Sequence, residues 1–529
     1  MQGHEMLRMV SSIAFLLAAA GCEPGGNGRE DAASRPDAMA WCGNGVVEPG
    51  EECDLGLLNR DDELGMCRTD CRVQTCGDWK LDPGELCDDG NFLDYDSCPS
   101  DCGWSLKRCG DGVMDEGEQC DDGNGDNWDG CTLSCQKAER RVNTYLRNFQ
   151  QYPSVGVSPD GSFVIVWRGE GADGNGVYAR LYDTAGEPEG EPFLVWEGSG
   201  EAHPKVYRAA SGEFTVLLAA IFKQDFSADG TPRGPATEIR TCDGYGAVYH
   251  DVVGIPDGRH AVVWLCQAGY EWGIYLQRFA ADGSLDGSEI SFPMYVDPSW
   301  IPAAMAPDGS VFVAWTDYWG TDELRAQGVG PDGQLLGETM TLVAPEEPFD
   351  LHYEPLTAMG IGASGVGTLV LAWAFHPANP EDQVQMSCKY RLFDWAGAPL
   401  GSERACLETG QVETYPFSLA MDEAGRFALI FRLYDDLSEP EFGTLRANDY
   451  LRRYDHSGTP LTVPEPLTLY GGLYQGGCCN QGPSLGLAGR GEVIIAVDGW
   501  FLGSGTYHDY PPDWGDGPEV YTRTFPSAW

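Results

Sequence analysis

The chain has 529 residues, and 82 acidic against 33 basic side chains give it a formal net charge of -49 at pH 7. This charge excludes most nucleic-acid-binding proteins, because neutralising phosphates requires clustered Lys and Arg. Hydrophobic residues make up 42% of the chain, so the acidity does not imply a disordered protein. The 70 Gly and 34 Pro have no collagen period and indicate tight turns between short strands, which predicts an all-β fold.

The first 22 residues have the pattern of an export signal. A single basic residue, Arg8, precedes an apolar run at 13–20 that is too short to span a membrane stably. The run leads into Ala-Ala-Ala-Gly-Cys at 18–22, which resembles the bacterial lipobox. The resemblance implies that Cys22 is lipidated and that the chain is exported to the bacterial outer membrane or cell surface, with the membrane as its partner. An ordinary signal peptide cut nearby is the alternative, and it leaves Cys22 as an odd thiol.

A flexible tether is expected at 23–40, which almost lacks large apolar side chains, and a cysteine-rich segment follows at 41–138. Its three repeats span 42–71, 76–102 and 109–135, with four Cys in each. The even number of Cys in each repeat predicts two disulfides, whose pairing stays open. Such a density of Cys also indicates an oxidising compartment. Such small units bury little apolar surface, so disulfides must supply much of their stability. The cysteines are Cys42, Cys53, Cys67, Cys71, Cys76, Cys87, Cys98, Cys102, Cys109, Cys120, Cys131 and Cys135.

The third repeat carries an ordered motif. It contains Cys-Gly-Asp-Gly at 109–112, Gly-Glu at 117–118, Cys-Asp-Asp-Gly-Asn at 120–124 and Asp-Gly-Cys at 129–131. This pattern resembles the disulfide-rich repeat found in many surface proteins of myxobacteria, and the other two repeats match it less closely. The resemblance covers under a fifth of the chain and implies a surface lipoprotein, but it implies no activity.

The acidic loops of the second and third repeats have a composition suited to calcium. Each places five oxygen-bearing side chains in a loop closed by Cys, and Ca²⁺ takes about six to eight oxygen ligands. Asp, Asn and Gly are also the commonest turn formers, so crosslinked turns with solvated carboxylates explain the composition equally well. The candidate ligands are Asp88, Asp89, Asn91, Asp94, Asp96, Asp121, Asp122, Asn124, Asp126 and Asp129.

Apolar runs rich in Val, Phe, Trp and Tyr alternate with Asp-Gly turns from residue 139 to 529. This pattern predicts a seven-bladed β-propeller, with an open solenoid or two β-sandwiches as alternatives. The seventh unit lacks a fourth strand, so we expect residues 141–145 to close the ring beside 520–525. The turn glycines that open the second strands lie 46 to 66 residues apart, at Gly161, Gly212, Gly258, Gly309, Gly367, Gly425 and Gly491.

Six further cysteines lie in the propeller region. Cys388 and Cys406 are equally far from the turn residue Gly397, which predicts a disulfide across one hairpin. A second bond is expected between Cys242 and Cys266. The adjacent Cys478 and Cys479 either form a vicinal ring or serve a structural loop.

No catalytic motif stands out. The His residues form no His-Glu-x-x-His, and no Ser lies in Gly-x-Ser-x-Gly, so we expect that the chain is not an enzyme. Loop aromatics such as Trp272 and Trp319 are candidates for stacking on sugar rings, unless they pack beneath the loops.

The function predicted from these features is that of a lipid-anchored cell-surface protein whose propeller binds a protein or a polysaccharide. Apart from the calcium ion considered for the acidic loops, no cofactor is expected, and nucleic acid is excluded as a partner. The alternatives are an exported propeller hydrolase such as a glycosidase, and a purely structural envelope protein.

Overall fold

The computed structural model describes 42–61, 67–73, 79–81, 88, 90, 112–114, 118, 120–121, 123, 129–131, 135, 137–146, 150–198, 203–218, 222–240, 247–268, 271–294, 301–316, 323–343, 357–375, 387–407, 413–435, 446–467, 473–474, 483–501 and 519–527. The chain divides into two compact units, Met1–Ser105 and Leu106–Trp529. The only helix in the described part is the short 3-10 helix η1 (Gly56–Leu58). No helix of these residues is long and apolar enough to cross a membrane.

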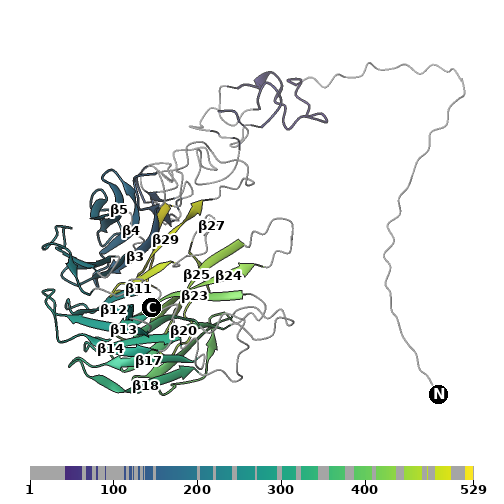
Figure 1. The fold of residues 1–529 in the computed structure, drawn as a ribbon. Coiled ribbons are helices and arrows are strands. Elements are labelled where there is room, and N and C mark those ends of the chain that lie inside the picture. Colours follow the sequence, from purple (N-terminus) through teal and green to yellow (C-terminus); the bar gives the residue numbers. More distant parts are fainter. Residues whose placement is uncertain are drawn as a thin grey trace, which may run out of the picture. The chain divides into compact units, whose positions relative to one another are not determined.

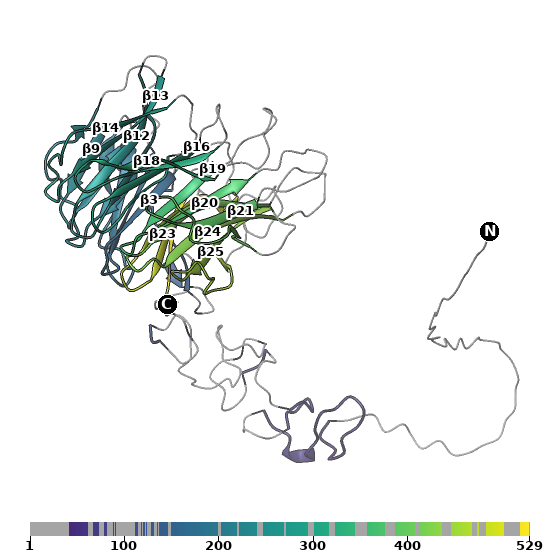
Figure 2. The ribbon, with the colours of Figure 1, turned by 90° about the horizontal axis from the view of Figure 1, so that it is seen from below.

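Thirty strands of the described residues form seven sheets, and the predicted all-β, seven-bladed propeller is confirmed (Figures 1 and 2). Each of the first six blades is a four-stranded antiparallel sheet. Blades 1 to 3 consist of β3 (Gln151–Val157), β4 (Phe163–Gly171), β5 (Gly174–Tyr182), β6 (Phe193–Glu197); β7 (Lys205–Arg208), β8 (Phe214–Leu218), β9 (Phe222–Phe226), β10 (Thr237–Glu238); and β11 (Ala247–Gly254), β12 (His260–Ala268), β13 (Glu271–Phe279), β14 (Ile290–Met294).

The next three blades repeat the arrangement. They consist of β15 (Ala303–Met305), β16 (Val311–Thr316), β17 (Leu324–Val329), β18 (Leu335–Val343); β19 (Thr357–Ala363), β20 (Thr368–Phe375), β21 (Ser387–Asp394), β22 (Arg404–Ala405); and β23 (Glu413–Met421), β24 (Phe427–Asp435), β25 (Arg446–Tyr454), β26 (Glu465–Pro466). The seventh blade comprises β28 (Ser484–Leu487), β29 (Val493–Phe501), β30 (Glu519–Phe525), β2 (Lys137–Arg141) and β1 (Asp129–Cys131), and β27 (Leu473–Tyr474) pairs with β29.

The innermost strands form a closed ring, because each contacts the next and β28 contacts β3. Apolar side chains fill the space between neighbouring blades in seven clusters, one for each pair of blades. Between blades 7 and 1, Ile494 and Val520 pack with Ile165 and Tyr182. Each sheet therefore hides both faces from water, which accounts for the continuous apolar runs of the second strands.

The seventh blade takes its outer strand from the other end of the chain. Arg140 lies opposite Thr522 and Arg141 opposite Tyr521 in an antiparallel ladder between β2 and β30. Strand β2 ends where the expected closing strand, 141–145, was to begin. The contact continues past β2, because Asn143 Oδ1 accepts a hydrogen bond of 2.9 Å from the backbone N–H of Val520.

The third cysteine repeat is continuous with this blade. Strand β1 pairs with β2, and its Cys131 lies opposite Lys137. The compact unit of the propeller accordingly begins at Leu106, whereas the expected boundary lay at 138/139. Backbone pairing thus adds the end of the repeat to the seventh sheet as a further strand.

The turns at one end of every blade share one conformation. In the described residues, thirteen turn glycines have φ between 74° and 100°, a region that side chains disfavour. In the first turn of blade 1, Gly161 N–H donates to the Ser158 carbonyl at 3.0 Å, and Asp160 Oδ1 accepts from Ser162 N–H at 2.9 Å. These turns define the turn face of the ring, and the innermost strands begin at the opposite face.

A polar side chain in the third strand braces six of the blades. It is Arg or Gln, and it donates to the backbone carbonyl ten residues later, as Gln224 does to Gly234 at 2.9 Å. Some of the arginines also reach the outer edge of the preceding blade, as Arg180 does to the Val142 carbonyl at 2.9 Å. The six donors are Arg180, Gln224, Gln277, Gln327, Arg391 and Arg452.

Replacing Asn143 with Ala should weaken the closure of the ring. The change leaves the buried N–H of Val520 without its acceptor, which costs about 1–3 kcal/mol of unfolding free energy. Denaturant titration measures this loss, with Asn175→Ala, at an exposed hairpin position, as the control. Equal stabilities of the two variants would contradict a role for Asn143 in closure.

Burial of His260 predicts acid sensitivity. The side chain is 3% exposed, its Nδ1–H donates to the Gly258 carbonyl at 3.1 Å, and burial lowers its pKa from 6.5 to about 4. In the unfolded chain His260 is protonated as the pH falls through 6.5, whereas in the folded chain it is protonated only near pH 4. The contribution of His260 to the free energy of unfolding should be complete above pH 6.5 and should fall by about 3 kcal/mol between pH 6.5 and pH 4. Denaturation curves of His260→Gln, measured at several pH values, should lack this fall in unfolding free energy. The same dependence on pH in the variant and the intact protein would contradict the role of His260.

Candidate functional site

Polar side chains gather where the innermost strands of blades 1 to 3 begin. Six residues make up this entry cluster, and they come from blades 1, 2, 3 and 7. They are Tyr152 in β3, His203 just before β7, Lys205 in β7, His250 and Asp251 in β11, and Asp498 in β29. All six residues are half-buried, and the Nδ1 atom of His250 is buried without a hydrogen-bond partner among the described residues.

Tyr152 holds the entry cluster together from a strained backbone position. Its φ is 57°, a left-handed value that a bulky residue adopts at a cost of about 1–3 kcal/mol. Its N–H donates to Asp498 Oδ2 at 3.3 Å, and its ring stacks on His203 at 4.0 Å between centroids. The ladder between β3 and β4 shifts register between Gln151 and Ser154, so a bulge turns Tyr152 out of the regular strand.

His250 and Asp251 present the titratable groups of the cluster. His250 Nε2 lies 2.6 Å from the His203 carbonyl, so Nε2 carries the proton and Nδ1 has the free lone pair. Burial lowers the pKa of His250 to about 4, and Lys205 lowers it further. Burial raises the pKa of Asp251, against the opposing attraction of Lys205. At neutral pH the cluster therefore offers a neutral imidazole beside an ammonium group and a carboxyl group of reduced acidity.

The chemistry of this arrangement suits an uncharged, hydroxyl-rich ligand. Lys205 is a hydrogen-bond donor, Asp251 and Asp498 are acceptors, and the Tyr152 ring has an apolar face. The cluster combines both kinds of contact on one side of the ring. The sequence did signal these positions, because each polar residue at an inner strand stands seven to nine residues before a turn glycine.

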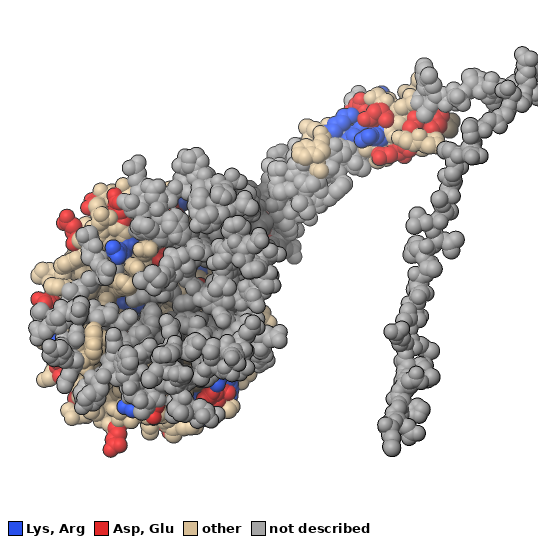
Figure 3. All heavy atoms as spheres, turned by 45° about the vertical axis from the view of Figure 1, so that its right-hand side comes forward, with Lys and Arg blue, Asp and Glu red and all other residues tan. Residues whose placement is uncertain are grey.

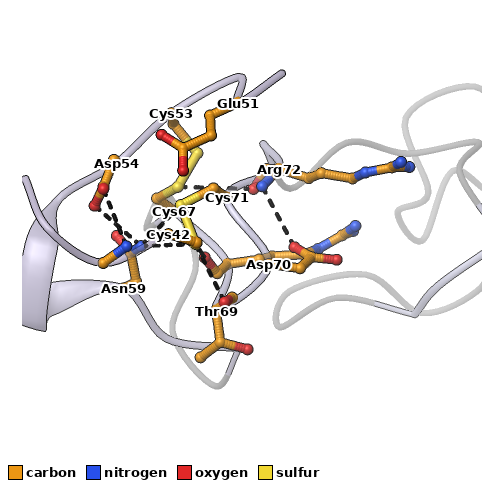
Figure 4. The surroundings of a disulfide bond; sticks show 12 residues. Cys42, Glu51, Cys53, Asp54, Asn59, Cys67, Thr69, Asp70, Cys71 and Arg72 are labelled. Atoms are coloured by element: carbon orange, nitrogen blue, oxygen red, sulfur yellow. Dashed lines mark hydrogen bonds between the residues drawn. A yellow bond between two sulfur atoms is a disulfide. The ribbon is translucent and has the colours of Figure 1, made fainter. Parts of the chain in front are cut away.

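One aspartate, Asp54, connects separate parts of the first cysteine repeat through hydrogen bonds. Figure 4 shows the Asp54 carboxylate beside the disulfides Cys42–Cys71 and Cys53–Cys67. Oδ2 accepts from the N–H groups of Gly43 and Asn44 at 3.0 Å each, and Oδ1 accepts from Gly56 and Asn59. These hydrogen bonds lower the pKa of Asp54 against the opposing effect of burial. The carboxylate thus joins the two ends of the repeat.

The equivalent aspartates of the other repeats act alike. Asp88 Oδ1 accepts from Trp79 and Gly90 at 2.8 and 2.9 Å, and Asp121 Oδ1 accepts from Gly112 and Gly123 at 2.7 and 2.8 Å. These two proposed calcium ligands therefore hold turns together. The side chain of Asp129, in β1, is not described, and the remaining candidates lie outside the described residues: Asp89, Asn91, Asp94, Asp96, Asp122, Asn124 and Asp126. Calcium binding stays a prediction.

Two groups of described residues are compact enough for a metal ion, and their cysteines speak against one. They are Cys42, Glu51 and Cys71, and Glu118, Asp121 and Cys135. All three cysteines are disulfide-bonded, so they offer no thiolate.

The remaining disulfides follow the same pattern. Cys120 bonds Cys131, in the positions of Cys53 and Cys67, and Cys388 bonds Cys406 across its hairpin. Cys135 and Cys266 are also disulfide-bonded. The other cysteines named from the sequence lie outside the described residues, as does Cys22: Cys76, Cys87, Cys98, Cys102, Cys109, Cys242, Cys478 and Cys479. The Cys242–Cys266 bond stays a prediction.

One of the expected loop aromatics is a packed strand residue. Trp272 lies in strand β13 and packs half-buried against the apolar cluster between blades 3 and 4. It is therefore part of the packing instead of an exposed sugar platform. Trp319 lies outside the described residues.

Comparison with family models finds one match, to a domain of unknown function (DUF4215) over residues 104–136. This is the third cysteine repeat, and the match supports the repeat itself but no family of myxobacterial lipoproteins. No curated protein matches the sequence.

Solved structures match the chain at low identity and with TM-scores below 0.5. An ulvan lyase of polysaccharide lyase family PL25 is 10% identical, with a TM-score of 0.42, 68% of this chain and 93% of that chain covered. The polysaccharide lyase Uly1 is 9% identical, with a TM-score of 0.44 and coverages of 74% and 92%. The neuraminidase-like protein of subtype N11 from A/flat-faced bat/Peru/033/2010 (H18N11) is 10% identical, with a TM-score of 0.38 and coverages of 61% and 92%.

These likenesses assign no activity to this chain, but they correct one expectation. The prediction that the chain is not an enzyme is wrong, because it is contradicted by polysaccharide lyases and a neuraminidase-like protein among the similar structures. The prediction rested on missing sequence motifs. A propeller assembles its polar residues from separate blades, so a short motif is a poor test of its chemistry.

Proposed function

We propose that the propeller recognises a polysaccharide at the entry cluster. The observation that carries the proposal is the convergence of side chains from four blades around Tyr152, whose strained backbone is held by contacts to Asp498 and His203. Backbone strain of this kind persists where surrounding contacts maintain it, and it concentrates at functional sites. A sugar ring fits the mixture of an aromatic face with hydrogen-bond donors and acceptors.

Cleavage of the bound polysaccharide is a second candidate. It is favoured by the pair of adjacent residues His250 and Asp251, whose pKa values are lowered and raised. A neutral imidazole is a candidate base and a carboxyl group with a raised pKa is a candidate acid. Both roles act on the same ligand at the same place, so one set of variants tests them.

Two variants separate the site from its scaffold. Tyr152→Gly removes the ring but accepts the left-handed backbone without strain, so binding should weaken at least about tenfold while stability does not fall. Lys205→Gln should weaken binding to a similar extent. Affinity electrophoresis against neutral, acidic and sulfated polysaccharides measures both, with His456→Ala on the turn face as the control.

The outcomes discriminate between the candidates. If both variants bind polysaccharide as the intact protein does, the proposed site is wrong. If the intact protein binds none of the polysaccharides, the proposed function is wrong. If new reducing ends appear, His250→Gln should abolish them and leave binding in place. Cleavage that survives this substitution would exclude the imidazole as the base.

We also propose that the chain is displayed on a bacterial surface through a lipid on Cys22. The lipobox-like end of the N-terminal segment supports this, and the odd number of cysteines, 19, leaves one for a lipid. Metabolic labelling with an alkynyl palmitate analogue should mark the full chain and leave Cys22→Ser unmarked. Ser34→Ala, in the tether, is the matched control, and equal labelling of Cys22→Ser would refute the lipid anchor.

A further inference from the structure

The turn face carries a second site, far in the fold from where the inner strands begin. A cavity of about 630 Å³ opens between the turns of blades 1 and 2. Its polar lining includes Arg208, at the end of β7, with Asp160, Asp183, Glu189 and Asp229 from the surrounding turns. No part of the entry cluster lines this cavity.

Arg208 is the unusual member of the lining. It is 5% exposed, and its Nε and Nη1 atoms have no hydrogen-bond partner. Two buried guanidinium nitrogens without partners are costly, because hydrogen bonds to a charged group contribute about 1.5–3 kcal/mol each. Asp160 and Glu189 attract it through space, yet burial still lowers its pKa. The guanidinium is therefore available to an anionic group.

The carboxylates around Arg208 are fixed in place and only partly used. One oxygen of each aspartate accepts N–H groups of its own turn, as Asp183 Oδ1 does from Ala185 and Glu187 at 2.9 Å and Asp229 Oδ1 from Thr231 at 3.0 Å. Among the described residues, no hydrogen bond is found for the second oxygen of Asp183 or for the exposed Glu189 carboxylate, and Asp229 is bonded only within its own turn, to Thr231. The turns thus hold acceptors toward the cavity without saturating them.

The charges select the ligand. Four carboxylates against one guanidinium favour ammonium groups, and Arg208 disfavours a bare metal ion by repulsion. Figure 3 shows acidic side chains on the visible surface of the propeller, so the field around the protein also attracts cations. We propose that this cavity binds a basic amino acid, whose carboxylate meets Arg208 and whose ammonium groups meet the turn carboxylates.

Calorimetric titration of the full chain with L-lysine tests the proposal. Saturable binding is expected, and Arg208→Gln should weaken it at least about tenfold, because the carboxylate loses its charged partner. Cadaverine, which has the two amines without the carboxylate, should bind the intact protein at least about tenfold more weakly than L-lysine. Arg233→Gln, a nearby arginine outside this cavity, is the control and should leave binding unchanged.

A substitution of the exposed Glu189 keeps the proposal testable if the Arg208 variant fails to fold. Glu189→Gln keeps the shape of the side chain and should weaken L-lysine binding about threefold by removing one charge. No saturable heat with L-lysine would overturn the proposal. It would equally be overturned if cadaverine binds as tightly as L-lysine, or if Glu189→Gln binds L-lysine as the intact chain does. These outcomes are independent of polysaccharide binding at the entry cluster, because the two sites share no residue.

Discussion

The whole propeller depends on apolar contact between neighbouring sheets. A single blade has two apolar faces, and only a ring supplies a partner for each of them. The cluster between blades 7 and 1 is the step that closes the ring, because it joins segments from opposite ends of the chain, such as Val142 and Val520. The other six clusters join blades that follow one another in sequence.

Closure by β2 also explains how the third cysteine repeat connects to the ring. The third repeat ends in β1, which lies on the outer edge of β2, so its disulfide-bonded end is hydrogen-bonded to the seventh sheet. The aspartate that follows the second cysteine joins each repeat internally. In the first repeat its four hydrogen bonds and the two disulfides stabilise a segment that buries little apolar surface.

The two faces of the ring carry different chemistry for a structural reason. On the turn face, glycine and aspartate recur because one turn conformation is repeated, so carboxylates accumulate there. At the opposite face the inner strands start, and the blades bring unlike side chains together, as in the stack of Tyr152 on His203. The first face suits a cationic ligand, and the second suits a ligand bound by mixed polar and aromatic contacts.

From the sequence alone came the number of blades, the turn positions and the cysteine repeats, because hydrophobic alternation and Gly or Cys spacing are local properties. The Cys388–Cys406 bond was foreseeable from a single hairpin. Only the tertiary structure decided which residues meet across blades: Tyr152 with Asp498, 346 positions apart, and Arg208 with the turns of blade 1. The first contact requires closure of the ring, and the second requires the packing of consecutive blades. The residue pattern of one strand encodes neither neighbour. The same distance along the chain explains why the absence of short sequence motifs does not exclude an enzyme.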